Sequence, residues 1–467
     1  MIRRLLDTPS FYFTVAAVLA VLAIGSQFSF DPSFKAVGGA EEIEQLAVRD
    51  DVNVVFVLVD ALRADHLGTY GYERPTSPTI DAMTARGVRF ANVAAQSSWT
   101  KASMASLWTA MYPQRNGILR FDDGLPSEAV MAAEVFQDAG FRTAGIFRNA
   151  WVGGNFGFDQ GFDLYVRTKP SLTPNRLKAS SVSTGGLRGS DIDATESAIE
   201  FMLSSVGERF LLYVHYMDVH QYSYDSDSDL FGSDFGDLYD NAIHWVDINI
   251  GRLLEAMGRL NLLENTIVVI AADHGEAFEE HGREGHAREL YREVQFTPWL
   301  IWLPFDLEEP LVVDAQVANI DIWPTLLDLV GLDPIPGADG RSALPAILGA
   351  ARGESPPSEF QERAVFSQID GHWGRVGKAP FPMVAVVKPP YRFHHQTENP
   401  RRDELFDHRT DPTEQDNIVS KDPETAAVLR EAVEEYLEAS VPAWEATDIE
   451  LDEMRLNQLR ALGYKIE

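Results

Sequence analysis

Residues 52–60 read VNVVFVLVD, and residues 266–274 read TIVVIAADH. Each stretch is a nearly continuous run of apolar and β-branched residues, which is typical of a strand buried on both faces of a parallel sheet. Each run ends in polar residues that can bind a cation, Asp60 in the first and Asp273 with His274 in the second. Ligands bind beyond the carboxyl ends of the strands in such a sheet. The two stretches therefore predict a metal site at that edge, although Asp60 taken alone would also fit a helix N-cap.

Strands and helices alternate outward from these two stretches. The sequence predicts further strands at 88–93, 143–147, 210–215 and 299–303, and helices at 77–86, 101–111, 193–203, 238–260 and 321–330. This alternation predicts an α/β fold whose mostly parallel central sheet is covered by helices on both faces. Shorter strands within 365–394 and a helix at 424–438 predict a small antiparallel α+β subdomain. We therefore expect a catalytic domain over 52–350 and a C-terminal subdomain over 363–467.

The composition limits the possible partners. The chain has 467 residues, 39 basic and 71 acidic, for a net charge of -32. Nucleic acids and anionic membrane surfaces are bound by basic surfaces, so we expect no nucleic-acid partner. An anionic substrate would need local positive charge from a metal and a few basic side chains. The absence of cysteine excludes disulfides, thiolate zinc sites and a cysteine nucleophile.

The N-terminus resembles an export signal. Arg3 and Arg4 precede an apolar run at 11–24, and such a positive flank stays in the cytoplasm while the following chain is translocated. Residues 1–30 are therefore predicted to be a single membrane anchor, with the catalytic domain in the periplasm or outside the cell. The alternative is a cleaved signal peptide and a secreted protein. The acidic, glycine-containing residues 31–51 are predicted to be a linker.

Thr100 stands immediately before the predicted helix at 101–111. As an N-cap it would lie at the positive end of that helix, where an anion is stabilised by free backbone N–H groups. A metal that binds the threonine alcohol can deprotonate it and polarise the ester under attack. Thr100 is therefore a candidate nucleophile, and the alternative is a capping residue without chemistry.

The chain resembles the sulfatase-like branch of the alkaline phosphatase superfamily. The resemblance is carried by VLVDALRADHLGTYGY (57–72), TAMYPQRNG (109–117), YVHYMDVH (213–220), ADHGE (272–276), DIWPTLLDL (321–329) and DELFDHRTDPTEQDN (403–417). A further motif, ALGY (461–464), lies near the C-terminus. The motifs follow the family's order, and the resemblance covers nearly everything after residue 52. The resemblance implies the α/β fold expected above, the small C-terminal domain and a metal-dependent hydrolase acting on ester bonds.

The nucleophile position departs from the sulfatase pattern. Sulfatases carry Cys or Ser followed by x-P-x-R and convert the first residue to formylglycine. Counting back from Pro113 places the nucleophile position at Thr100, the proline position at Ala102 and the arginine position at Met104. We therefore expect no formylglycine. A threonine here resembles the phosphodiesterases and the phosphoethanolamine or phosphoglycerol transferases, in which a metal-bound Thr forms a phospho-threonine.

The predicted metal site binds one divalent ion through Asp60, Thr100, Asp273 and His274. Two carboxylates, an alcohol and an imidazole suit zinc, manganese, magnesium or calcium. A second metal is possible, with Asp218 as one of its ligands.

Four further side chains are candidates for binding or catalysis. His220 and His286 are predicted catalytic residues that bind the oxygens of the ester or protonate the leaving oxygen. Lys101 and Arg63 are predicted to neutralise substrate charge, although each would also fit a plain ion pair.

Three functions remain open. The main expectation is an exported hydrolase that cleaves a phosphate monoester or diester through Thr100 and a phospho-threonine intermediate. The first alternative is a phosphoethanolamine or phosphoglycerol-type transferase acting on an envelope lipid or glycan. The second is a sulfuric ester hydrolase similar to arylsulfatases. The expected partners are a small anionic ester or an envelope-derived substrate, and the membrane through residues 1–30.

Overall fold

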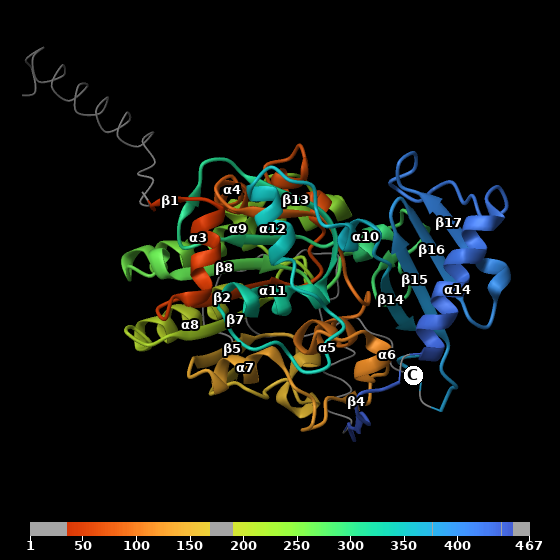
Figure 1. The fold of residues 1–467 in the computed structure, drawn as a ribbon, viewed down its shortest axis with the longest axis horizontal. Coiled ribbons are helices and arrows are strands. Elements are labelled where there is room, and N and C mark those ends of the chain that lie inside the picture. The colour runs from red at the N-terminus through yellow and green to blue at the C-terminus, as the bar shows by residue number, and fades with distance from the viewer. Residues whose placement is uncertain (1–34, 169–189, 376, 440, 452–467) are drawn as a thin grey trace, which may run out of the picture. The chain divides into compact units, whose positions relative to one another are not determined.

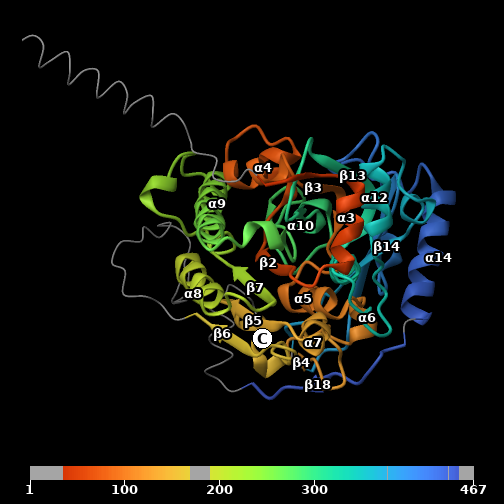
Figure 2. The same cartoon turned by 60° about the vertical axis from the view of Figure 1, so that its left-hand side comes forward.

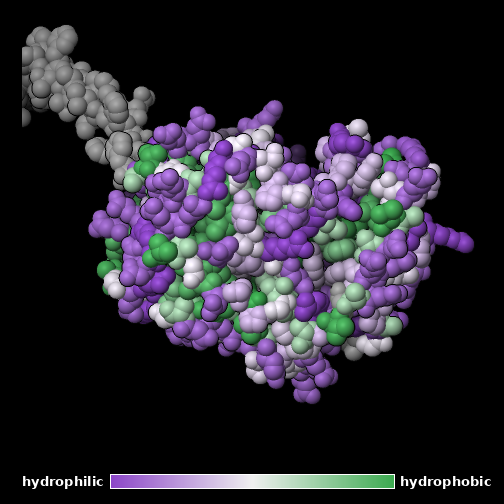
Figure 3. Space-filling model, viewed as in Figure 1, coloured by the Kyte–Doolittle hydropathy of each residue, from purple (hydrophilic) through white to green (hydrophobic). Residues whose placement is uncertain are grey.

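The computed structural model describes residues 35–168, 190–375, 377–439 and 441–451. Its described residues from Val37 onward form one compact unit. The predicted anchor or signal peptide at 1–30 lies outside the described residues, as do residues 452–467 of the predicted subdomain. Within the described ranges, none of the helices has both the length and the apolar character that a membrane crossing requires. Apolar side chains on the face shown in Figure 3 are scattered among hydrophilic ones.

The core of the unit is an eight-stranded sheet in the order β13-β3-β11-β8-β2-β7-β5-β6. β2 (Asn53–Val59) lies between β7 and β8 and is parallel to both. β11 is antiparallel to β3 and β8, whereas the other described pairings of this sheet are parallel. The remaining strands are β3 (Val88–Ala94), β5 (Arg142–Phe147), β6 (Leu164–Arg167), β7 (Phe210–Tyr216), β8 (Thr266–Ala271), β11 (Trp299–Trp302) and β13 (Leu311–Ala318). The predicted mostly parallel sheet is confirmed.

Helices cover both faces of this sheet (Figure 2). All seven residues of β2 are buried, and because side chains alternate along a strand, Phe56 and Leu58 belong to one apolar cluster while Val57 and Val59 belong to the other. The first cluster includes residues of α3 (Ala40–Gln45), α5 (Thr100–Thr109), α7 (Ala132–Asp138), α11 (Ile322–Leu329) and α12 (Leu344–Ala351). The second includes residues of α4 (Pro78–Thr84), α8 (Asp191–Ser204) and α9 (Phe235–Arg259). The predicted layering is confirmed.

A smaller antiparallel sheet lies beside the large one, to its right in Figure 1. Its strands are β14 (Val365–Asp370), β15 (Pro382–Lys388), β16 (Tyr391–Gln396) and β17 (Glu404–Asp407), in that order. Leu429 and Val433 of α14 (Pro423–Ala439) pack with Val386 and Phe393 of the sheet. The predicted antiparallel α+β subdomain is confirmed. Short elements complete the unit: β1 (Val37–Gly38), β4 (Asp123–Gly124), α6 (Pro113–Asn116), β9 (Ala277–Phe278), β10 (Glu284–Gly285), α10 (Arg292–Gln295), β12 (Asp306–Leu307), α13 (Ser358–Gln361) and β18 (Thr447–Asp448).

The predicted linker at 31–51 is wrong for its second half. Residues 40–48 form α3 and a 3₁₀ turn, and Ile43 and Leu46 are fully buried in the first apolar cluster. These two residues are three apart, so one face of the helix is apolar although its sequence is rich in glutamate. Gly331, which follows α11, lies against this segment so closely that a Cβ there would be 2.0 Å from the carbonyl oxygen of Ala47.

Gly331→Ala tests this packing, with Gly353→Ala as its matched control. Both glycines have a left-handed φ, +69° and +73°, but a Cβ at Gly353 meets nothing within 4 Å. We expect each substitution to lower the free energy of unfolding by about 1–2 kcal/mol through backbone strain. Gly331→Ala should lose about 1–3 kcal/mol more through overpacking. Urea unfolding measures the difference, and equal losses would show that residues 40–48 are not held against Gly331.

Candidate active site

The predicted ligands meet at the carboxyl edge of the large sheet. Asp60 directly follows β2, and Asp273 with His274 follows β8, the parallel neighbour of β2. Ligand atoms of these three buried residues lie within 4.8 Å of one another. Gly275 lets the chain after His274 pass close to α10, because a Cβ there would lie 2.1 Å from the carbonyl oxygen of Glu293.

Thr100 joins this group from a third element. It is the first residue of α5, which follows β3, and it is fully buried. Its Oγ1 lies 3.2 Å from His274 Nε2 and 3.4 Å from Asn149 Nδ2. The structure therefore brings all four predicted metal ligands together, with the candidate nucleophile among them.

The unpaired atoms of the cluster point to a cation. Within the described residues, Asp60 Oδ1 and Asp273 Oδ2 are buried without a hydrogen-bond partner, and His274 Nε2 lies 3.8 Å and 3.4 Å from them. His274 Nδ1 lies 2.9 Å from the carbonyl oxygen of Gly275. Because a carbonyl only accepts, Nδ1 carries the proton and Nε2 offers its lone pair to the cluster. Two carboxylate oxygens and an imidazole nitrogen that converge in this way fit a divalent metal.

The opposite oxygens of the two carboxylates are held in place. Asp60 Oδ2 accepts hydrogen bonds from Asn149 Nδ2 at 2.6 Å and faces His215 Nε2 at 3.0 Å. Asp273 Oδ1 accepts from the backbone N–H of Ala61 at 3.2 Å. Ala61 takes a left-handed φ of 61°, which is unfavourable for a residue with a side chain. These contacts fix the direction of the oxygens that face the cluster.

His215 and Asn149 were missed by the sequence reasoning. His215 lies within β7, a fully buried strand, and faces the hydroxyl of Tyr213 through Nδ1 at 2.6 Å. A lone histidine in an otherwise apolar strand was the available signal. Asn149 follows the end of β5, so it carries the same strand-end signal that singled out Asp60.

The electrostatics of the cluster reflect two carboxylates in a small buried space. Burial raises the pKa of Asp273 to about 6, and the nearby charge of Asp60 adds to this shift. Burial also opposes ionisation of Asp60, but His220 and His215 outweigh it and hold its pKa below the ordinary value. For His274, burial is outweighed by the two carboxylates, which raise its pKa. The cluster therefore gathers negative charge that a divalent cation would balance.

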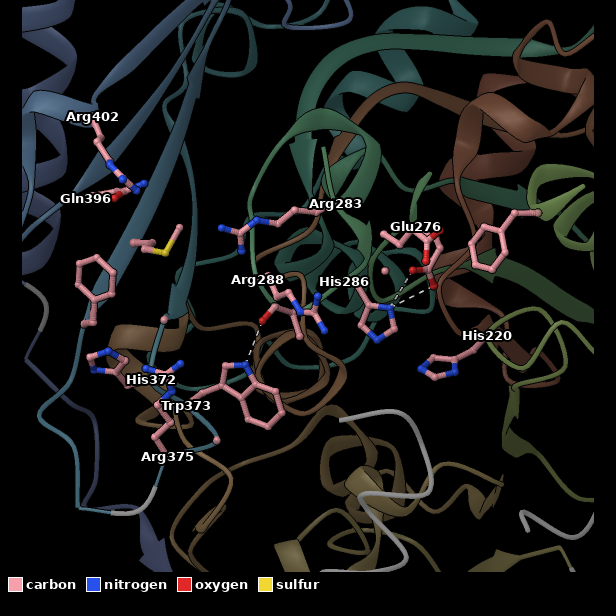
Figure 4. A pocket seen from close by; sticks show the side chains of 18 of the residues that line it. His220, Glu276, Arg283, His286, Arg288, His372, Trp373, Arg375, Gln396 and Arg402 are labelled. Atoms are coloured by element: carbon pink, nitrogen blue, oxygen red, sulfur yellow. Dashed lines mark hydrogen bonds and ion pairs between the residues drawn. The ribbon is translucent and has the colours of Figure 1, made fainter. Parts of the chain in front are cut away.

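His220 and His286 lie beside the cluster, as the prediction requires. The ring of His286 is 4.4 Å from that of His274 and 4.8 Å from that of His220, between centroids. Glu276 accepts a hydrogen bond from His286 Nδ1 at 3.1 Å and so orients its ring. Burial lowers the pKa of His220 to about 4. Both histidines line a cavity of about 710 Å³ (Figure 4). Glu276 was quoted in the ADHGE motif but was given no role.

Lys101 does not reach the cluster, so its predicted role in neutralising substrate charge is not met by the geometry. Its side chain is fully buried, and its Nζ donates to the carbonyl oxygens of Phe121 and Asp123 at 2.7 Å and 2.6 Å. Its Nζ also lies 4.3 Å from the ring centre of Phe156. Burial lowers the pKa of Lys101 to about 7. This lysine supports the loop beyond α5.

The side chain of Arg63 is likewise bound by other groups of the protein. Its guanidinium pairs with Asp65 at 2.9 Å and with Glu280 at 2.5 Å, and it donates to the carbonyl oxygen of Glu276 at 3.1 Å. Two carboxylates already neutralise its charge, so the predicted substrate contact is not met. Arg63 instead ties the turn after β2 to the loop that contains Glu276.

The predicted second metal finds no support at Asp218. This carboxylate pairs with the buried guanidinium of Arg148, and it accepts hydrogen bonds from the backbone N–H of Asp191 and from Trp245 Nε1, each at 2.9 Å. Protein donors therefore already occupy both oxygens of Asp218. Among the described residues, Asp60, Asp273 and His274 form the one group with metal-ligand geometry.

Comparison with known proteins identifies the class of protein. The sulfatase family model matches residues 52–332, which is more than half of the chain, so the chain belongs to the sulfatase family. A model of the C-terminal part of N-sulphoglucosamine sulphohydrolase matches residues 280–441.

The relatives are mainly sulfatases. An ulvan-active sulfatase of Formosa agariphila is 25% identical over 83% of this chain and 82% of its own length. Human arylsulfatase A is 28% identical over 67% of this chain and 70% of its own. The crystal structure of a phosphonate monoester hydrolase of Agrobacterium radiobacter has a TM-score of 0.64 at 16% identity, covering 86% of this chain and 99% of that one. These findings support the sulfuric ester alternative better than the phosphate ester expected first.

Metal analysis of purified protein tests the cluster. We expect about one divalent ion per chain, and we expect Asp273→Asn to lose it because the substitution removes a charge that the cation needs. Asp218→Asn is the control, since its carboxylate is occupied by protein donors, and it should keep the metal. Elemental analysis after dialysis measures both. Loss of metal in the Asp218 variant alone would contradict this assignment.

Proposed function

We propose that this chain hydrolyses a sulfate ester on a carbohydrate, with unmodified Thr100 as the nucleophile. The observation that carries the proposal is the position of Thr100 Oγ1, 3.2 Å from His274 Nε2 and beside the unpaired carboxylate oxygens. Membership of the sulfatase family supports the sulfate ester. The ulvan-active relative supports a carbohydrate as the alcohol part of the substrate.

The reaction has two displacements at sulfur. The oxygen of Thr100 attacks the sulfur, the S–O bond to the sugar breaks, and the sugar oxygen leaves with a proton. Water then attacks the sulfo-threonine, and sulfate and the Thr100 alcohol are released. A divalent cation held by Asp60, Asp273 and His274 would favour the deprotonated alcohol and the charge on the ester oxygens.

His220 and His286 contact the ester from the side of the cavity. Both rings border the cavity next to His274, so they reach the oxygens of an ester that Thr100 attacks. A ring N–H there donates a hydrogen bond to the charge that develops on these oxygens. The negative charge of a bound ester raises the low pKa of these rings, so that a protonated ring supplies the proton that the leaving oxygen takes up. Glu276 holds the ring of His286 in this direction.

A phosphate or phosphonate ester is the second candidate substrate. Residue 100 is a threonine, and a threonine alcohol cannot supply the aldehyde hydrate of a formylglycine. A metal-bound alcohol also attacks phosphorus, where the phospho-threonine is resolved by water. The structural likeness to a phosphonate monoester hydrolase supports this candidate.

We also propose that the catalytic unit works outside the cytoplasm. Arg3, Arg4 and the apolar run at 11–24 support export with residues 1–30 as anchor or signal peptide. Cell fractionation with an antibody against the chain tests this. Recovery from the membrane fraction favours the anchor, recovery from the periplasm or medium favours cleavage, and recovery from the cytosol contradicts export.

Thr100→Ala tests the nucleophile, with Thr100→Ser as the matched variant that keeps an alcohol. The chain is incubated with sulfated oligosaccharides, phosphate diesters and phosphonate monoesters, and released sulfate or alcohol is measured. We expect sulfate esters to be cleaved fastest. Thr100→Ala should lower kcat at least about 10³-fold, because the attacking oxygen is gone, while Thr100→Ser retains much of it.

Two controls accompany these assays. Thermal unfolding of both variants shows that the fold is intact. Adding glycerol distinguishes hydrolysis from the transfer considered above, because a transferase would place the group on glycerol. Full activity of Thr100→Ala would exclude Thr100 as nucleophile. Faster cleavage of the phosphorus esters than of the sulfate esters would show that a phosphate or phosphonate ester is the substrate.

A further inference from the structure

The cavity beside His220 and His286 extends well beyond the cluster. It has a volume of about 710 Å³ and reaches the small sheet, where Met383 of β15 and Gln396 of β16 line it. Figure 4 shows Arg283 between His286 on one side and Gln396 on the other. Cavities of this size bind drug-sized molecules, whereas a single sulfate group is far smaller. Most of the cavity therefore faces the part of the substrate that is not cleaved.

The lining of this cavity is basic, unlike the rest of the chain. It contains the arginines Arg283, Arg288, Arg375 and Arg402 and the acids Glu276 and Glu284. The chain as a whole has a net charge of -32. Four arginines in one cavity of such an acidic protein create a local positive field that attracts anions.

Three of the arginines have no competing partner among the described residues. Arg283 pairs with Glu289 at 2.8 Å. For Arg288, Arg375 and Arg402 the described residues provide no ion pair or side-chain hydrogen bond, and all three are exposed. Arg63, by contrast, is neutralised by two carboxylates. The three arginines are therefore available for a ligand.

A second cavity adjoins the first. This neighbour has a volume of about 440 Å³ and shares Arg283, Arg288, Met383, Gln396 and Arg402 with the first. Its own lining adds Arg401 and the acids Glu289, Asp403 and Glu404, so the excess of positive charge lies in the first cavity and along the shared arginines. The two cavities share these lining residues and thus adjoin as one cleft beside the small sheet.

We infer that this cleft, here called the arginine cleft, binds a saccharide that carries at least one further anionic group besides the ester that Thr100 attacks. The inference rests on the proposed function. Guanidinium groups bind sulfate and carboxylate oxygens through paired hydrogen bonds. Arg288, on the segment that carries His286, binds the nearer group, and Arg402, on the small sheet's side, binds the more distant one. The substrate class is a multiply anionic oligosaccharide.

Binding to the full chain with Thr100→Ala tests the arginine cleft without turnover. The probes are a heparin tetrasaccharide, the same tetrasaccharide without sulfate groups, and inorganic sulfate, each titrated by calorimetry. We expect the sulfated tetrasaccharide to bind at least about 10-fold more tightly than inorganic sulfate, and less tightly as salt is added. The desulfated probe shows whether carboxylates alone are recognised.

Two arginine variants and a matched control complete the test. In the Thr100→Ala background, Arg288→Ala and Arg402→Ala should each weaken tetrasaccharide binding about 3- to 10-fold, because the contacts are partly screened by water. Their affinity for inorganic sulfate should fall by less, because a single sulfate ion does not span both arginines. Arg259→Ala removes an exposed arginine of α9 that pairs with Glu255 outside the cleft, and it should have no effect.

The outcomes separate this inference from the proposed function. Tetrasaccharide binding no tighter than that of sulfate, or equal losses in the Arg259 variant, would overturn the arginine cleft while leaving sulfate-ester hydrolysis intact. Failure of the unsubstituted chain to cleave any sulfate ester would instead overturn the proposed function, because the binding measurement does not require turnover.

Discussion

The approach of Asp60 and Asp273 is the interaction on which the site depends. Two buried carboxylates whose ligand atoms lie within 4.8 Å of each other and of His274 repel one another, and burying unpaired charge costs several kcal/mol per ion. The protein satisfies one oxygen of each carboxylate with fixed donors and leaves the other unpaired. A cation bound here would turn this repulsion into attraction, and its binding would then also stabilise the fold.

The arrangement of strands makes this approach possible. β2 and β8 are parallel neighbours in the middle of the large sheet, and the residues that follow them leave the sheet at the same edge. β7 and β5 continue the row and contribute His215 and the position of Asn149. Asp60, Asp273 and His274 therefore follow the ends of fully buried strands, whereas Thr100 comes from the first turn of α5. Strand ends of this kind hold side chains in place for catalysis.

The sequence was sufficient for the sheet and for bringing the candidate ligands together, because apolar runs that end in polar residues reflect a constraint on every buried parallel strand. It was insufficient wherever the direction of a long side chain decides the role. Lys101 contacts backbone carbonyls and Arg63 contacts two acids. Neither set of contacts can be predicted from the spacing of neighbouring residues in the sequence. The role of Asp218 was also missed, because its partner Arg148 lies 70 residues away in the chain. The helix at 40–45 was missed because only its buried face is apolar.

Trp373 connects the small sheet to the candidate active site. It follows β14, stacks on Trp99 with ring centres 4.5 Å apart, and donates a hydrogen bond to the carbonyl oxygen of Ala287. Trp99 precedes Thr100 and Ala287 follows His286, so one indole touches the neighbours of two site residues. Replacing the small sheet by that of a relative would therefore change more than substrate recognition. A replacement that lacks this indole would also remove the packing partner of Trp99, the residue beside Thr100.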